Sequence, residues 1–174
     1  MARFVELRRH TASDGDVLTQ EGVERAVAIG GQLSGGYDLL VSSGAQRATQ
    51  TLACFLAGLG KPMPSGVVVD PRWRSEVEDR WFGAYERAGT GDIQSFKTAD
   101  PELVDSESGR FGDALRSLFD SLPEGGRALL VGHSPMLEAA VYGLIGTVVE
   151  PISKGAGVLV TEEEPGRYSV AALK

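Results

Sequence analysis

Two residues of this sequence combine a reactive side chain with a telling position. They are His10 and His133, the only histidines of the chain. Each follows closely on a short apolar run that is typical of a buried strand, so each is predicted to lie where a strand ends and a loop begins. Ligands of α/β sheets collect at these carboxyl ends of the strands. A single loop histidine is weak support for catalysis, but their shared placement makes both residues candidate active-site groups.

Arginines accompany the first histidine. Arg8 and Arg9 directly precede His10. A neutral imidazole can attack phosphorus while guanidinium groups beside it neutralise the phosphoryl oxygens. The alternative interpretation of His10 is a capped surface histidine. For Arg8, which shares a strand face with Glu6, we expect a structural ion pair.

A second polar segment, Ser42-Ser43-Gly44-Ala45-Gln46-Arg47, joins a predicted strand to a predicted helix. Free backbone N–H groups and the positive end of the helix dipole favour an anion at such a point. We expect Arg47 to point toward that anion. In the alternative interpretation the serines only cap the helix and Arg47 is solvated.

The elements that position these residues alternate between strand and helix. The patterns predict strands at residues 3–9, 37–41, 67–69, 127–131, 155–161 and 168–173, and helices at 19–33, 45–60, 111–122 and 136–145. The last two strands are expected to pair across the turn EEEPG. This order predicts an α/β fold with three layers, α/β/α, in which helices cover both faces of a mostly parallel central sheet.

Residues 70–108 show little regular period and are predicted to form an irregular insertion that covers the pocket. Aromatic side chains in such a segment can wall a pocket, and they can equally pack a loop onto the core. The aromatic residues concerned are Trp73, Trp81, Phe82 and Tyr85.

Composition limits the classes of function. A formal net charge of -7 over 174 residues argues against a sequence-independent nucleic-acid binder. The single cysteine, Cys54, allows neither an intrachain disulfide nor a thiolate zinc cluster, which fits a reducing cytoplasm. The N-terminal residues lack a signal core, and no apolar run approaches the length that a membrane helix needs. We expect a cytoplasmic chain whose residues 1–174 form one domain without a membrane partner.

Four segments together resemble the histidine phosphatase, or phosphoglycerate mutase-like, superfamily. LRRHT is similar to its strand-end Arg-His motif, LTQEG to the start of its first helix, SSGAQRATQT to its second arginine motif and LLVGHSPML to its late histidine motif. The resemblance runs in order from residue 3 to about residue 145. It implies that His10 is transiently phosphorylated, that Arg9, Arg47 and His133 bind the transferred phosphoryl group, and that no metal or other cofactor is needed. A protonated His133 could then donate to an oxygen whose charge grows during phosphoryl transfer.

The sequence departs from the family pattern at Thr11, where a glycine is usual after the histidine. The Thr11 hydroxyl could contact the phosphate or the leaving group, or it could face away and leave the mechanism unchanged.

The general acid is the second departure. The family often supplies a carboxylic acid from the segment after the third strand, and here Glu76, Glu78 and Asp79 compete for that role. Counting back from Phe82-Gly83 favours Asp79, whereas counting forward from Asp70-Pro71-Arg72 favours Glu76. An exposed acidic loop is the alternative interpretation of all three.

The resemblance implies a metal-independent phosphatase of the histidine acid phosphatase type that hydrolyses phosphomonoesters. Within the family, a mutase-type phosphotransferase and a protein phosphohistidine phosphatase are alternatives, and the short chain favours a phosphatase over a mutase. The expected partner is a small-molecule phosphate ester or a phosphoprotein. An alternative from another class is a catalytically silent module that binds a phosphorylated ligand.

Overall fold

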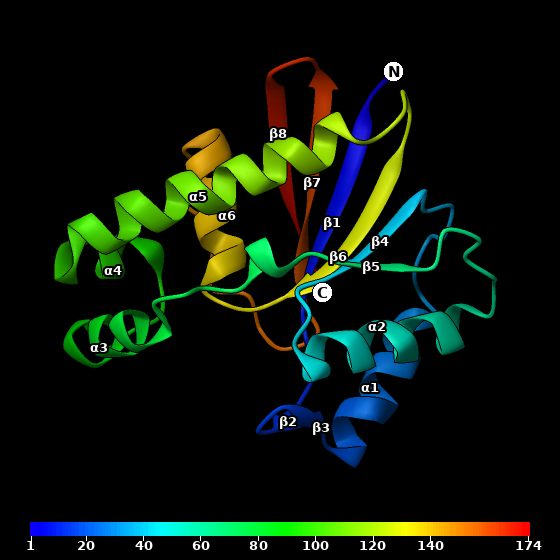
Figure 1. Cartoon of the computed structure of the whole chain (residues 1–174), viewed down its shortest axis with the longest axis horizontal. Coiled ribbons are helices and arrows are strands. Elements are labelled where there is room, and N and C mark those ends of the chain that lie inside the picture. The colour runs from blue at the N-terminus through cyan, green and yellow to red at the C-terminus, as the bar shows by residue number, and fades with distance from the viewer.

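A six-stranded mixed sheet runs through the middle of the chain, whose computed structural model describes residues 1–174 (Figure 1). Its strands, in spatial order, are β5 (Val67–Val69), β4 (Leu39–Ser42), β6 (Arg127–Gly132), β1 (Arg3–Arg9), β7 (Gly157–Glu164) and β8 (Arg167–Leu173). The strands from β5 to β1 are parallel, while β7 and β8 form an antiparallel hairpin on the β1 edge. A small separate ribbon consists of β2 (Ser13–Asp14) and β3 (Val17–Leu18). The predicted, mostly parallel sheet and its C-terminal hairpin are confirmed.

Helices cover both faces of the sheet. On one face lie α1 (Gln20–Gly30) and α2 (Gln46–Leu59), and on the other lie α5 (Pro101–Asp120) and α6 (Met136–Ile145) (Figure 1). Two further helices, α3 (Glu78–Ala88) and α4 (Ile93–Ala99), lie beside the N-terminal half of α5. The predicted three-layer α/β/α architecture is confirmed. None of these helices combines the length and the apolar character that a bilayer crossing requires.

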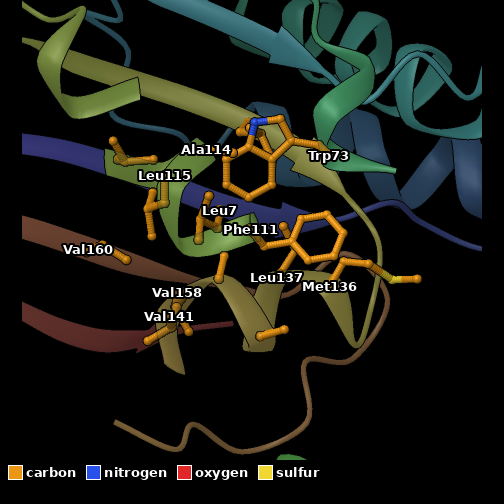
Figure 2. Packing of buried hydrophobic residues seen from close by; sticks show 14 of the residues in the cluster. Leu7, Trp73, Phe111, Ala114, Leu115, Met136, Leu137, Val141, Val158 and Val160 are labelled. Atoms are coloured by element: carbon orange, nitrogen blue, oxygen red, sulfur yellow. The ribbon is translucent and has the colours of Figure 1, made fainter. Parts of the chain in front are cut away.

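The continuous apolar run of β6 follows from its place between the two helical layers. Ala128 and Leu130 belong to the buried cluster on the α5 and α6 side, whereas Leu129 and Val131 belong to the cluster on the α1 and α2 side. Successive side chains of a strand point to opposite faces, so a strand that is covered on both needs apolar residues throughout. Figure 2 shows how Trp73 and Phe111 fill the first cluster, with a separation of 6.4 Å between ring centroids.

The strand β1 differs, because one of its faces carries a buried ion pair. Arg8 Nε lies 2.6 Å from Glu6 Oε2, and the Tyr37 hydroxyl donates to Glu6 Oε1 at 3.0 Å. The Arg8 Nη1 group also donates to the Gly155 carbonyl at 3.1 Å. The predicted ion pair is confirmed, and its polar atoms have partners although both residues are buried.

The predicted irregular insertion at residues 70–108 is wrong, because most of it is helical. It contains a 3₁₀ turn at Pro71–Trp73, then α3, α4 and the first part of α5, which begins at Pro101 instead of Phe111. Aspartates cap the later helices, since Asp92 accepts from the Ser95 N–H and Asp100 from the Leu103 N–H.

Sparse apolar patterns explain why these helices were missed. The helix α3 buries only Trp81 and Ala84, which is too narrow an apolar stripe to show a period of 3.6. In α5 the buried stripe includes Glu107 and Ser108, whose polar side chains interrupt the pattern. Elsewhere the predicted boundaries are close: α6 is as predicted, and β4 begins at Leu39 instead of Tyr37.

Two glycines let α5 and α6 approach closely. A methyl group on Gly112 would lie 2.8 Å from the Gly143 carbonyl carbon, and one on Gly143 would lie still closer to the Ser108 backbone. The backbones of the two helices can therefore approach this closely only at residues without side chains. This contact fixes α6, whose first turn follows directly on the His133 loop.

We expect Gly112→Ala to destabilise the protein by about 1–3 kcal/mol, because the added methyl group must push α5 and α6 apart. Gly109→Ala is the matched control: the same change on the same helix meets no atom within 4 Å and gains up to about 1 kcal/mol from helix propensity. Urea unfolding of both variants measures the difference. Equal stabilities would show that the close approach of the helices is not constrained.

Candidate active site

The parallel register of three strands brings the two histidines together. Arg9 of β1 is paired with Gly132 of β6, and Ser42 of β4 is paired with Val131 of β6. The residues that follow these strand ends are His10, His133 and Ser43. The two imidazole rings lie with centroids 5.4 Å apart, so the expected meeting of both histidines at one edge of the sheet is observed.

The His10 ring is held in the form that a nucleophile requires. Its Nδ1 atom lies 2.8 Å from the Thr11 carbonyl oxygen. Because a carbonyl can only accept, Nδ1 carries the proton and the lone pair of Nε2 is left free. Burial, with a smaller contribution from the charges of Arg47 and Arg9, lowers the pKa of His10 to about 4. The ring is therefore neutral at neutral pH and can attack through Nε2.

The His133 ring is neutral as well. Burial and the charge of Arg47 lower the pKa of His133 to about 3. This differs from the protonated ring considered with the resemblance, because burial and the nearby cations disfavour the charged form. A phosphoryl dianion would raise this pKa, since a neighbouring opposite charge favours the protonated form. The ring is positioned by a 2.7 Å contact between His133 Nε2 and Ser43 Oγ.

The two arginines approach the site from different elements. Arg9, at the end of β1, donates from Nη1 to the Ile152 carbonyl oxygen at 3.0 Å. Arg47 lies in the first turn of α2, where its Nη1 group pairs with Asp16 Oδ1 at 3.0 Å. Its backbone N–H donates to the same oxygen at 3.3 Å. A carboxylate of the chain therefore already lies at the helix start where the sequence predicted an anion.

The serines before α2 do not cap it. Ala45 is the N-cap residue, while Ser42 Oγ accepts from the Gly44 N–H at 3.1 Å inside the preceding turn. Gly44 has a φ of 96°, a backbone conformation that other residues rarely adopt. The turn therefore presents Arg47 from a fixed helix start, and the interpretation of the serines as helix caps is wrong.

A cleft of about 630 Å³ is bordered by His133; His10, whose ring centroid lies 5.4 Å from that of His133, is not itself a lining residue. Arg9, Arg47 and His133 form one end of it. The remaining lining residues are Glu78, Asp79, Trp81, Phe82, Tyr85, Gly91, Phe96, Ser134, Pro135, Met136, Glu138, Pro151 and Ile152. The segment after β5 thus supplies one wall of the cleft, as expected, although that wall is helical.

The three candidates for the general acid do not all lie in the cleft. Glu78 and Asp79 lie in the first turn of α3 and line the cleft. Glu76 does not reach the cleft, because it lies in a neighbouring surface depression with Arg74 and Arg80. The candidate favoured by counting forward is therefore not supported.

Thr11 is not a phosphate-binding side chain in this structure. Its hydroxyl donates to the Gly22 carbonyl of α1 at 2.8 Å, and its N–H donates to Thr51 Oγ1 at 3.2 Å. Thr11 is buried and does not line the cleft. Its hydroxyl is directed toward α1, which agrees with the second of the two roles considered for it.

The aromatic residues divide between the two roles that the sequence left open. Trp73 is buried in the core and does not reach the cleft. Trp81, Phe82 and Tyr85 line the cleft, and Trp81 is also buried, with its Nε1 group donating to Glu107 Oε1 at 3.1 Å.

Sequence reasoning missed Glu138, since α6 reads as plain core. Its carboxyl is 1% exposed, yet it lines the cleft beside Arg9. It accepts from the Ser134 hydroxyl at 2.9 Å and from the Ile152 N–H at 3.3 Å. Arg9 and Glu138 therefore hold the carbonyl and the N–H of the same residue, Ile152. A glutamate in the otherwise apolar helix MLEAAVYGLI was the available signal.

We expect both imidazole rings to stay neutral down to about pH 5. The physical reason is their burial beside arginines, which places the pKa of His10 at about 4 and that of His133 at about 3. Because the chain has only two histidines, an NMR titration of ring nitrogen shifts is readily assigned with a His10→Ala spectrum. A midpoint near 6.5 for either ring would contradict this electrostatic description.

We expect Glu138→Gln to become more stable relative to the wild type as pH rises. Burial raises the pKa of Glu138 from 4.5 to about 7, so the wild type loses stability as pH rises through that range, whereas glutamine does not titrate. The relative gain between pH 5 and 8 should be on the order of 2 kcal/mol. Urea unfolding measures it, with Glu86→Gln on the exposed side of α3 as the control. A pH-independent difference would refute the assignment.

Comparisons with known proteins agree with this geometry. A phosphoglycerate mutase from Bacillus anthracis str. Sterne superimposes with a TM-score of 0.73 at 16% identity, covering 99% of this chain and 92% of that chain. The protein histidine phosphatase SixA, solved with tungstate, has a TM-score of 0.66 at 20% identity and covers 100% and 97%. A phosphoserine phosphatase from Entamoeba histolytica, in complex with 3-phosphoglyceric acid, has a TM-score of 0.73 at 16% identity and covers 99% and 97%.

At such identities the solved structures show a shared fold. The search of curated proteins found no match. The family model described as histidine phosphatase superfamily (branch 1) matches residues 5–156, a range that includes both histidines and both arginines of the cleft. Because that match spans most of the chain, this protein belongs to the histidine phosphatase superfamily.

Proposed function

We propose that this protein is a phosphomonoester phosphatase that works through a phosphohistidine on His10. The observation that carries the proposal is the state of that ring: it is neutral, its Nδ1–H is held by the Thr11 carbonyl, and it lies beside a cleft with two arginines. Membership of the histidine phosphatase superfamily supports the same activity.

In the first step, His10 Nε2 forms a bond to phosphorus while the bond from phosphorus to the alcohol oxygen breaks. Arg9, Arg47 and His133 neutralise and orient the phosphoryl oxygens, which is most of what a loose transition state requires. Arg47 can bind a phosphoryl oxygen and keep its contact with Asp16, because a guanidinium carries five N–H donors.

The departing alcohol oxygen needs a proton. Asp79 is the proposed donor, since it was favoured by the motif spacing and lines the cleft, and Glu78 beside it is the alternative. Water then attacks the phosphohistidine, releasing inorganic phosphate and restoring the neutral ring.

The phosphoryl charge is met by guanidinium and imidazole groups, so we infer that the reaction needs no metal ion. The short chain favours hydrolysis over return of the phosphoryl group, because a mutase usually needs longer insertions to enclose its bound intermediate. A small phosphate ester and a phosphoprotein both remain proposed substrates. A single cysteine and an acidic composition fit a cytoplasmic location.

We expect the wild type to release phosphate from an aryl phosphate in the presence of a chelator. His10→Ala should lower kcat/KM by at least about a thousandfold, because the nucleophile is lost. Acid-labile, base-stable phosphoprotein should appear in rapidly quenched wild type and be absent from the variant. Glu86→Gln is the control for a surface change.

Turnover by His10→Ala within tenfold of the wild type would refute a phosphohistidine mechanism. Vanadate binding with no turnover and no phosphoprotein in the wild type would instead support a silent binding module.

A further inference from the structure

The two arginines that line the cleft lie apart from the carboxylates that α3 contributes to it. Its only cationic lining residues, Arg9 and Arg47, lie at the phosphoryl end with His133. The acidic lining residues are Glu78 and Asp79 on α3, and Glu138, which lies beside Arg9 and whose pKa burial raises to about 7. A second anionic group on a bound phosphate ester would therefore meet the carboxylates of Glu78 and Asp79 in the cleft, while Arg74 and Arg80 border these two residues outside it.

The wall formed by α3 adds two exposed aromatic rings. Phe82 is 64% exposed and Tyr85 is 51% exposed, and both line the cleft. Being three residues apart, they share one side of the helix. Trp81, which directly precedes Phe82, also borders the cleft but is buried in the core.

This wall is firmly supported from behind. The Tyr85 ring packs against Phe96 with centroids 6.5 Å apart, and Phe96 packs edge to face on Trp81 at 5.2 Å. Trp81 is in turn held by its hydrogen bond to Glu107. Tyr85 thus belongs to a layered aromatic cluster, so its ring can bind a ligand with little loss of side-chain freedom.

The facing wall is apolar as well. Its lining residues include Pro135, Met136, Pro151 and Ile152. Isolated exposed apolar residues are common on protein surfaces and need no explanation. Here apolar groups from separate segments border the same space, next to the nucleophile, which is the arrangement of a binding site for an apolar group.

We propose that this half of the cleft is a leaving-group subsite, formed by Phe82, Tyr85, Glu78 and Asp79, that selects phosphate esters of flat, apolar alcohols without a second negative charge. Alcohols that carry a positive charge are favoured most. The inference rests on the proposed function, because it assigns the phosphoryl group to the Arg9, Arg47 and His133 end.

The two parts of the subsite contribute differently. Stacking on Phe82 and Tyr85 favours planar groups over small polyols, by roughly three- to tenfold for each ring. Glu78 is exposed, so it discriminates between cationic and anionic groups by only about threefold. Asp79 adds nothing to this preference, because the proposed proton donor must carry its proton. The expected preference for a cationic over an anionic aryl group is therefore about threefold.

Non-hydrolysable benzylphosphonates test the subsite by calorimetry. The para position carries hydrogen, an aminomethyl group or a carboxymethyl group, so the phosphonate end is the same in all three. We expect the affinity to fall in the order aminomethyl, hydrogen, carboxymethyl. Inorganic phosphate measures the phosphoryl end alone.

Variants separate the aromatic and acidic contributions. Phe82→Ala and Tyr85→Ala should each weaken benzylphosphonate binding about three- to tenfold and leave inorganic phosphate binding unchanged. Glu78→Gln should narrow the gap between the two charged ligands about threefold. Glu86→Gln, on the same helix but outside the cleft, should leave the gap unchanged.

Equal affinity for the two charged ligands, or tighter binding of the carboxymethyl compound, would overturn the charge assignment. Unchanged benzylphosphonate binding in both aromatic variants would overturn the stacking assignment. Because calorimetry reports binding only, an inactive enzyme with the expected binding order would refute the catalytic proposal and leave the subsite intact. An active enzyme without that order would refute the subsite alone.

Discussion

The parallel pairing of β1, β6 and β4 is the constraint on which the rest of the site depends. Backbone hydrogen bonds align Arg9 with Gly132 and Ser42 with Val131, so the side chains that follow must meet at one edge. Neither histidine needs a special local conformation to reach the other. The pairing works only because β6 is apolar on both faces and can be buried between two layers of helices. The positions of the site residues at the sheet edge therefore depend on the packing of β6 between the helices.

Much of this arrangement could be predicted from local patterns. The strand ends at His10 and His133 follow from short apolar runs, the start of α2 from a polar turn, and the sheet from alternation of strand with helix. These features are determined by neighbours in the sequence, and residues 5–156 also match one family. Even the buried pair of Glu6 and Arg8 follows from strand periodicity.

The features that the sequence did not predict depend on contacts between residues that are far apart in the chain. The helices between β5 and β6 were missed because their buried faces are narrow or include Glu107, whose partners Ser75 and Trp81 lie outside α5. Glu138 was missed in an apolar helix, because its partner, the Ile152 N–H, lies outside that helix. Likewise, the motif that contains Thr11 does not determine whether its hydroxyl faces a bound phosphate or the Gly22 carbonyl. Each case is decided by which polar partner the fold supplies.

The contact between Asp16 and Arg47 has a consequence for how long a product stays bound. The carboxylate satisfies both the guanidinium and the start of α2 before any ligand arrives. A bound anion must share these donors with the negative charge of Asp16. Its binding free energy is therefore less favourable, both for the substrate and for the phosphate product. Free phosphate, which has no apolar part to hold it elsewhere in the cleft, is the species most easily released. The hairpin that carries Asp16 thus favours rapid turnover over tight product retention.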